Sequence, residues 1–352
     1  MVLTGQILFT NKNELVYRAG QTIEGIVKYT IDKPTEFTSV TLSLRGKGIC
    51  DWETLADRMV FGVFGRTFVG SENYIVQRMD LLQAKQNQIV TLQAGSYEHP
   101  FRFVLPEELP SNYRDITCNI SYYVVLKFAK PSFMSLKKKF YVELRIQGGI
   151  KPYLPEPLIA ELRKEFASKK KSLTLKAEVE RTFLTAGENI KLSLIINNDS
   201  EVPISSIKTE LIKYLTYKSN SGDEKHRTTT VKGSEQKYPG AKEKTVSKVS
   251  YDVPTLPKMY SVHTNILVKE YRLKVTANFG FPHKEAFLEI PVVIVENVDD
   301  VGVEKTDDEQ PPPYWQVMSA DKGKAEKIKM VKTENVNKSN NEDTVKPHSS
   351  KT

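Results

Sequence analysis

Hydrophobic and polar residues alternate with a period of two over much of the chain, the pattern of β-strands that bury one face. In the first half the clearest runs are residues 25–31, 39–46 and 121–128, which are rich in β-branched and aromatic side chains. Residues 189–196 and 271–276 continue the pattern in the second half. Many short strands at near-regular spacing predict antiparallel β-sandwiches, so the expected fold class is all-β.

One segment between the two strand-rich halves has a different composition. Residues 157–166 read Pro-Leu-Ile-Ala-Glu-Leu-Arg-Lys-Glu-Phe, in which Ala, Leu, Glu, Arg and Lys are strong helix formers. The composition predicts a short helix here, which would link the two halves.

The two halves resemble copies of each other. Residues 19–23 (Ala-Gly-Gln-Thr-Ile) head the first strand block, and residues 186–190 (Ala-Gly-Glu-Asn-Ile) head the second. In each, the glycine is suited to turn the chain into a strand. A step with two prolines follows at residues 105–110 and 253–257, where a crossing between strands or a sheet edge is expected. A tyrosine-containing strand follows each step, and this shared order predicts two immunoglobulin-like sandwiches in tandem.

The pattern also predicts where the units begin and end. We expect an N-terminal β-sandwich over residues 1–148, a linker over 149–171, a C-terminal β-sandwich over 172–296 and a tail over 297–352. The tail is acidic at first and then polar and lysine-rich. Such a composition buries too little apolar surface to fold, so the tail is predicted to be disordered.

The tail carries a short motif made of Pro311, Pro312, Pro313 and Tyr314. Consecutive prolines fix φ and remove backbone donors, so they favour an extended polyproline II helix. Aromatic-lined grooves such as those of WW domains accept this helix, and Pro-Pro-x-Tyr is the spacing that WW domains favour. The alternative is that the segment is only a spacer.

The net charge of +8 is dispersed along the chain. Its densest runs in the body are the lysines at 137–139 and 169–171, which solvated strand ends and a linker would explain. Nucleic-acid binding is not predicted, because basic residues are not interleaved with stacking aromatic residues along one element. A weak contact with anionic lipids is possible, at about 1 kcal/mol for each well-placed lysine.

The sequence favours a cytoplasmic protein. The apolar run at residues 290–295 is too short to span a bilayer, and residues 1–10 do not have the form of a secretory signal. The only cysteines are Cys50 and Cys118, fewer than a secreted two-domain β protein usually carries. We expect both to be buried, inert thiols.

No catalytic or metal-binding constellation is evident. The five histidines are scattered, and none has metal-ligand spacing to another or to a cysteine. Residues 45–48 (Arg-Gly-Lys-Gly) are interpreted as a turn between strands, not as a phosphate loop, and there is no nucleophile elbow. We therefore predict a protein that is not an enzyme and that needs no cofactor or metal.

One apolar run could have either of two roles. Residues 61–70 place three phenylalanines among glycines, where a loop is expected between Trp52 and the strand at Tyr74. Exposed, the run would form an apolar patch suited to a membrane or a partner. We favour the other interpretation, an irregular edge strand, because most apolar residues belong to the core.

Together these features resemble the arrestin fold, and specifically the α-arrestin, or arrestin-domain-containing, family. The resemblance extends to about Asn297. It rests on the following segments: residues 19–23, Arg45-Gly46 with Trp52 after it, residues 99–103, 186–188, 197–200 and 253–257, and the strand at Tyr271. The Pro-Pro-x-Tyr motif that follows them adds to its specificity.

The resemblance implies an adaptor that is not an enzyme. Such proteins couple membrane cargo, for example receptors or transporters, to NEDD4-type HECT ubiquitin ligases, whose WW domains bind the Pro-Pro-x-Tyr motif. Pro311 and Pro312 would fill the proline groove, Pro313 would be the permissive position, and Tyr314 would be the specificity anchor. The implied location is cytoplasmic, at the periphery of the plasma membrane and endosomes. Many members carry two such motifs; the single motif here predicts weaker ligase capture.

Two other interpretations remain open. The chain could be an arrestin-fold coat scaffold resembling a retromer subunit, in which case the motif would be incidental. It could also be a redox-linked interaction protein that acts through Cys50 or Cys118, although the thioredoxin-interacting members use a cysteine in the second module, which has none here. The buried charged network by which visual and β-arrestins sense phosphates is not identifiable from the sequence.

Overall fold

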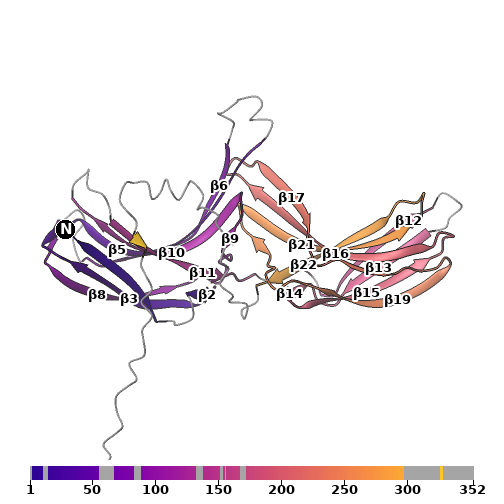
Figure 1. Cartoon of the computed structure of the whole chain (residues 1–352), viewed down its shortest axis with the longest axis horizontal. Helices are drawn as coiled ribbons and strands as arrows, with labels where there is room; N and C mark the ends of the chain where they lie inside the picture. Colours follow the sequence, from indigo (N-terminus) through magenta and orange to yellow (C-terminus); the bar gives the residue numbers. More distant parts are fainter. Residues whose placement is uncertain are drawn as a thin grey trace, which may run out of the picture.

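The protein consists of two β-sandwiches in tandem, which a computed structural model shows as an elongated molecule (Figure 1). The structure describes residues 2–10, 15–54, 67–82, 89–131, 138–150, 154, 156–166 and 172–296, and the two-residue strand at 326–327. Within these residues all regular secondary structure is β, as the alternation of hydrophobic and polar positions predicted.

The first sandwich is built from a three-stranded sheet facing a larger one. The small sheet has the order β1 (Leu3–Phe9), β3 (Thr22–Ile31), β8 (Gly95–Val104). The larger sheet has the order β2 (Val16–Arg18), β11 (Lys138–Gln147), β10 (Cys118–Ala129), β5 (Ser39–Glu53), β6 (Thr67–Asp80), and β9 (Tyr113–Arg114) pairs with β10. Separately, β4 (Thr35–Phe37) pairs with β7 (Val90–Leu92), and β23 (Glu326–Lys327) pairs with β11. The two main sheets meet in the core, where the rings of Tyr29 and Phe128 lie 5.1 Å apart.

The second sandwich has a similar plan, with one more strand in its smaller sheet. Its smaller sheet has the order β12 (Leu158–Glu165), β13 (Ser172–Val179), β15 (Asn189–Asn198), β19 (Thr245–Pro254). Its larger sheet has the order β14 (Phe183–Thr185), β22 (Ala286–Val295), β21 (Leu267–Phe279), β16 (Ile204–Lys218), β17 (Glu224–Thr230). Two short strands lie off this path: β18 (Gln236–Pro239) pairs with β16, and β20 (Val262–His263) pairs with β21.

The strand orders confirm the predicted duplication. The order β1-β3-β8 corresponds to β13-β15-β19, and β2-β11-β10-β5-β6 corresponds to β14-β22-β21-β16-β17. The matching glycines occupy the same place in each copy, because Gly20 (φ 86°) and Gly187 (φ 92°) both turn the chain just before a strand. That φ lies in the left-handed region, which glycine adopts without a Cβ penalty.

The predicted helix over residues 157–166 was wrong, because this segment forms strand β12. Leu158, Ala160 and Leu162 alternate with exposed residues and pack against the core of the second sandwich. The helix-forming residue types misled the prediction. The period-two order of apolar and polar side chains decides the outcome, since it lets β12 extend the sheet beside β13.

The predicted turn at residues 45–48 was also wrong, because β5 runs through it. Gly46 lies inside this strand, where a Cβ would stand 2.4 Å from ring carbons of Tyr122. The pairing of β5 with β6 shifts register between Gly46 and Lys47. The glycines here allow a close approach and an irregular register within a strand, which sequence alone does not distinguish from a turn.

The structure describes only part of the apolar run at residues 61–70. Residues 61–66 lie outside the described ranges, whereas Thr67 begins β6, the edge strand of its sheet. There Phe68 stacks on Trp52, with ring centroids 5.7 Å apart. The edge-strand interpretation is therefore confirmed for residues 67–70.

The expectation of two free thiols was wrong. Cys50 and Cys118 are both buried, as predicted, but their sulfur atoms are bonded to each other. The two residues are direct partners in the pairing of β10 with β5, which places their side chains side by side. Disulfides persist in oxidising surroundings, so this bond does not support the reducing compartment predicted from the low cysteine count.

Candidate functional site

The site predicted from sequence, Pro311, Pro312, Pro313 and Tyr314, lies outside the described residues. Within the described residues, several side-chain contacts between distant parts of the chain gather at the junction of the two sandwiches. This junction is the candidate site, because it holds the two sandwiches together.

Asp115 is the central acceptor of the junction. Its Oδ2 accepts hydrogen bonds from the hydroxyls of Tyr113 (2.7 Å) and Tyr217 (2.5 Å), one from each sandwich. Its Oδ1 accepts the backbone N–H groups of Thr117 and Cys118 at 2.8 and 2.7 Å. Burial, and then the hydrogen bond to Asp115, raise the pKa of Tyr113 and of Tyr217. Both phenols therefore remain hydrogen-bond donors at neutral pH.

A second group of contacts ties the ends of the sandwiches together. The guanidinium of Arg145 pairs with the carboxylate of Glu296 at 2.5 Å, and the Glu296 side chain is only 11% exposed. The hydroxyl of Tyr260 donates to the backbone oxygen of Asn112 at 2.8 Å. The side chain of Asn112 is held in turn by Leu144 and Ile146 of β11. A charge-assisted pair of this kind and a partly buried tyrosine hydrogen bond both constrain the angle between the two units.

Strand β6 and the β16–β17 hairpin form the third part of the junction and rise side by side in the centre of the molecule (Figure 1). The backbone N–H of Asn220 donates to the oxygen of Val69 at 2.9 Å, and its side-chain oxygen accepts from the N–H of Ser71 at 2.9 Å. Nearby, Glu72 accepts from the backbone and the side chain of Asn265, at 3.1 and 2.6 Å. The sandwiches are thus joined by backbone bonds as well as by side chains.

The apolar part of the junction lies beneath these contacts. Leu215, Tyr217, Val262, Ile266 and Leu267 of the second sandwich belong to the core cluster of the first. The sulfur of Cys50 lies 3.4 Å from the backbone oxygen of Ile266, so the disulfide is part of this contact. Burial of apolar area is the main stabilising term at such a junction, and the polar contacts fix its geometry.

Sequence reasoning missed Lys269, which is buried at the junction. It occupies an inward position of β21, between Leu267 and Tyr271. The signal was present as a lysine on the buried side of an alternating strand. Lys269 lies just before the alternating run predicted at residues 271–276, and a lysine ordinarily marks a solvent-facing position.

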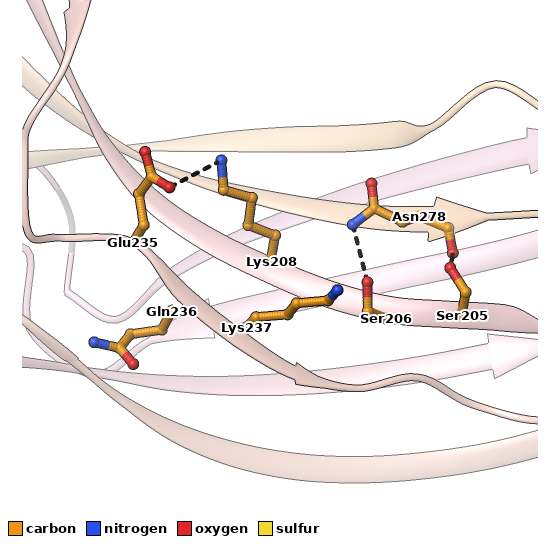
Figure 2. A pocket seen from close by; sticks show the side chains of 7 residues that line it. All are labelled: Ser205, Ser206, Lys208, Glu235, Gln236, Lys237 and Asn278. Carbon is orange, nitrogen blue, oxygen red and sulfur yellow. Dashed lines mark hydrogen bonds and ion pairs between the residues drawn. The ribbon is translucent and has the colours of Figure 1, made fainter.

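A polar hollow of about 540 Å³ lies in the second sandwich, away from the junction. Figure 2 shows Lys208 bonded to Glu235, and Ser205 and Ser206 bonded to Asn278. Lys208 also pairs with Glu210 at 3.0 Å, and these carboxylates raise the pKa of its amine. Because the charged groups neutralise one another, the hollow offers no evident chemistry for a ligand.

Among the described residues, no three His, Cys, Asp or Glu side chains are grouped so that they could hold a metal ion. In the same residues, no helix is long and apolar enough to cross a membrane.

Comparison with known proteins gives consistent matches to arrestin modules. Residues 6–146 match the family described as Arrestin (or S-antigen), N-terminal domain, and residues 169–298 match its C-terminal domain. The chain is 24% identical over 306 residues to Arrestin domain-containing protein 5 of Bos taurus, covering 82% of this chain and 90% of that protein. The human protein of the same name is 22% identical over 304 residues, with 82% and 86% covered. Arrestin domain-containing protein 4 of Mus musculus is 28% identical over 204 residues, with 55% and 48% covered.

Proposed function

Because this chain belongs to the α-arrestin family, we propose that it is a non-enzymatic adaptor that brings WW-domain ubiquitin ligases of the NEDD4 type to membrane cargo. The observation that carries the proposal is the order of its parts: two arrestin sandwiches are followed by Pro311, Pro312, Pro313 and Tyr314. The cargo class would be receptors or transporters, and the outcome would be ubiquitination followed by endocytosis and endosomal sorting.

The sandwiches and the segment after residue 296 would have different roles. The two sandwiches are joined at a junction that Asp115, Arg145 and their partners hold, and together they would hold cargo at the plasma membrane or at endosomes. The segment after residue 296 would present the proline motif in its polyproline II form, so that little ordering entropy is lost when a WW groove binds it.

Binding of the ligase would raise its effective concentration over nearby lysines. Those lysines include cargo lysines and also Lys322, Lys324, Lys327 and Lys329, which follow the motif closely in the sequence. Self-ubiquitination of the tail is therefore expected to accompany adaptor activity. With one motif, ligase capture would be weaker than in relatives that have two.

A reconstituted ubiquitination reaction tests the proposal. The full chain would be incubated with a NEDD4-type ligase and ubiquitin, and mass spectrometry would map diglycine remnants on its lysines. We expect Tyr314→Ala to abolish the remnants and Pro313→Ala, at the permissive position, to leave them. Equal modification of the wild-type chain and Tyr314→Ala would show that the motif does not recruit the ligase.

A further inference from the structure

Lys269 stands where the strand pattern calls for an apolar side chain. On β21 the inward positions are Leu267, Lys269, Tyr271 and Leu273, and the exposed fraction of Lys269 is only 6%. A buried amine is costly unless hydrogen bonds or ion pairs compensate the loss of water. The question is therefore which neighbouring groups offset the cost of burying the amine of Lys269.

Three tyrosine rings surround the amine. The Nζ atom of Lys269 lies 3.7 Å from the ring centroid of Tyr260, 5.2 Å from that of Tyr113 and 5.9 Å from that of Tyr271. Tyr113 belongs to the first sandwich, whereas the other two rings belong to the second. Tyr260 also bonds across the junction to Asn112. The cage around the amine is therefore completed only when the two sandwiches are in contact.

The carboxylates that face Lys269 are bonded to other partners. Glu296, at the end of β22, pairs with Arg145 of β11, and Asp115, after β9, accepts from two tyrosines. Among the described residues no carboxylate forms an ion pair with Lys269. Lys213 of β16 faces it with a like charge. On the neighbouring strand β20, the imidazole of His263 pairs with Glu270 of β21 at 3.5 Å, and both side chains are partly exposed.

Electrostatics agrees with this geometry. The pKa of Lys269 is lowered to about 7, chiefly by burial and secondly by the like charge of Lys213, whereas Glu296 and Asp115 act in the opposite direction. When the sandwiches separate, Tyr113 and Asp115 move away and water reaches the amine, which then regains the pKa of an ordinary lysine, roughly 10.4. Between these two values the joined state binds fewer protons than the separated state.

We propose that Lys269 makes the contact between the two sandwiches pH-dependent, so that protonation of its buried amine weakens the contact and favours their separation. The sign follows from linkage: the joined state gains stability as the pH rises through 7 towards 10 and loses it as the pH falls, and the loss levels off below pH 7. This device is independent of the proline motif and would act on the sandwiches, whatever they bind.

Amide hydrogen exchange of the full chain tests the proposal, with the N–H of Asn220 as reporter. This group donates to Val69 across the junction, so its protection factor measures the opening equilibrium once intrinsic exchange is divided out. From pH 8 to pH 6 we expect wild-type protection at Asn220 to fall about tenfold. The N–H of Leu105, which bonds to Gln21 within the first sandwich, serves as the internal reference and should not change.

Three variants decide the outcome. Lys269→Met has a neutral side chain of similar length, so Asn220 protection should be higher than in wild type and flat with pH. Lys269→Arg stays charged, so protection should be low and flat. Lys274→Met, on the same strand but paired with Glu210, should keep the wild-type pH dependence. The same pH dependence in wild type and Lys269→Met, or its loss in Lys274→Met, would overturn the proposal.

Discussion

Tyr217 of the second sandwich donates a hydrogen bond of 2.5 Å to Asp115 of the first, across 102 residues of sequence. The same carboxylate oxygen accepts from Tyr113, its neighbour in the first sandwich, at 2.7 Å. One half-buried carboxylate thus accepts hydrogen bonds from both units. Because two phenols and two backbone N–H groups converge on it, Asp115 can be fully satisfied only in the joined arrangement.

Removal of one of these donors should weaken the junction. In Tyr217→Phe the carboxylate of Asp115 loses its bond to the second sandwich but keeps Tyr113, so we expect a loss of about 1–2 kcal/mol in the free energy of unfolding. Urea denaturation followed by fluorescence would measure it. Tyr214→Phe is the matched control, because that hydroxyl bonds Glu289 within the second sandwich and is partly exposed. An equal loss of unfolding free energy in both variants would show that the bond from Tyr217 to Asp115 contributes no more than a hydrogen bond within one sandwich.

The disulfide should contribute to the stability of the first sandwich. Cys50 and Cys118 are 68 residues apart, and a loop of that length corresponds to about 4 kcal/mol in the chain-entropy model. We expect dithiothreitol to lower the urea midpoint of the wild-type chain. The doubly substituted chain, Cys50→Ala with Cys118→Ala, should have a lower midpoint that does not respond to the reductant. A wild-type midpoint that is the same with and without reductant would contradict a stabilising bond.

Gly46 should tolerate no side chain. A methyl group there would collide with the ring of Tyr122, which is fully buried, so Gly46→Ala should destabilise the protein by about 1–3 kcal/mol. Gly280→Ala is the control, since no atom lies within 4 Å of the position that its Cβ would occupy. Thermal denaturation of the two variants compares them directly. If Gly46→Ala and Gly280→Ala have the same melting temperature, the close packing of Tyr122 does not exclude a side chain at position 46.

Local patterns were enough to predict the strands and their duplication. The alternation at residues 121–128 and the glycines at Gly20 and Gly187 act within a few residues of chain, so they carry their information in the sequence itself. Residues 157–166 failed because residue types that favour a helix also carried a period of two, and pairing with β13 decided between them.

The features that sequence reasoning missed depend on contacts between distant segments. The bond between Cys50 and Cys118 requires the register of β5 against β10, which no short window of sequence specifies. The surroundings of Lys269 include Tyr113 from the other sandwich, 5.2 Å from its amine. The proline motif, by contrast, was predicted from three consecutive prolines alone, and it lies outside the described residues.

Titration of the full chain against a panel of isolated WW domains tests whether the proline motif binds the domain that a ligase would supply. We expect saturable binding that Tyr314→Ala abolishes and Pro313→Ala preserves, because the first removes the anchor and the second changes only the permissive position. Failure of the wild-type chain to bind any WW domain would contradict the adaptor function. The arrestin sandwiches would then be better explained as a coat-type scaffold in which the motif is incidental.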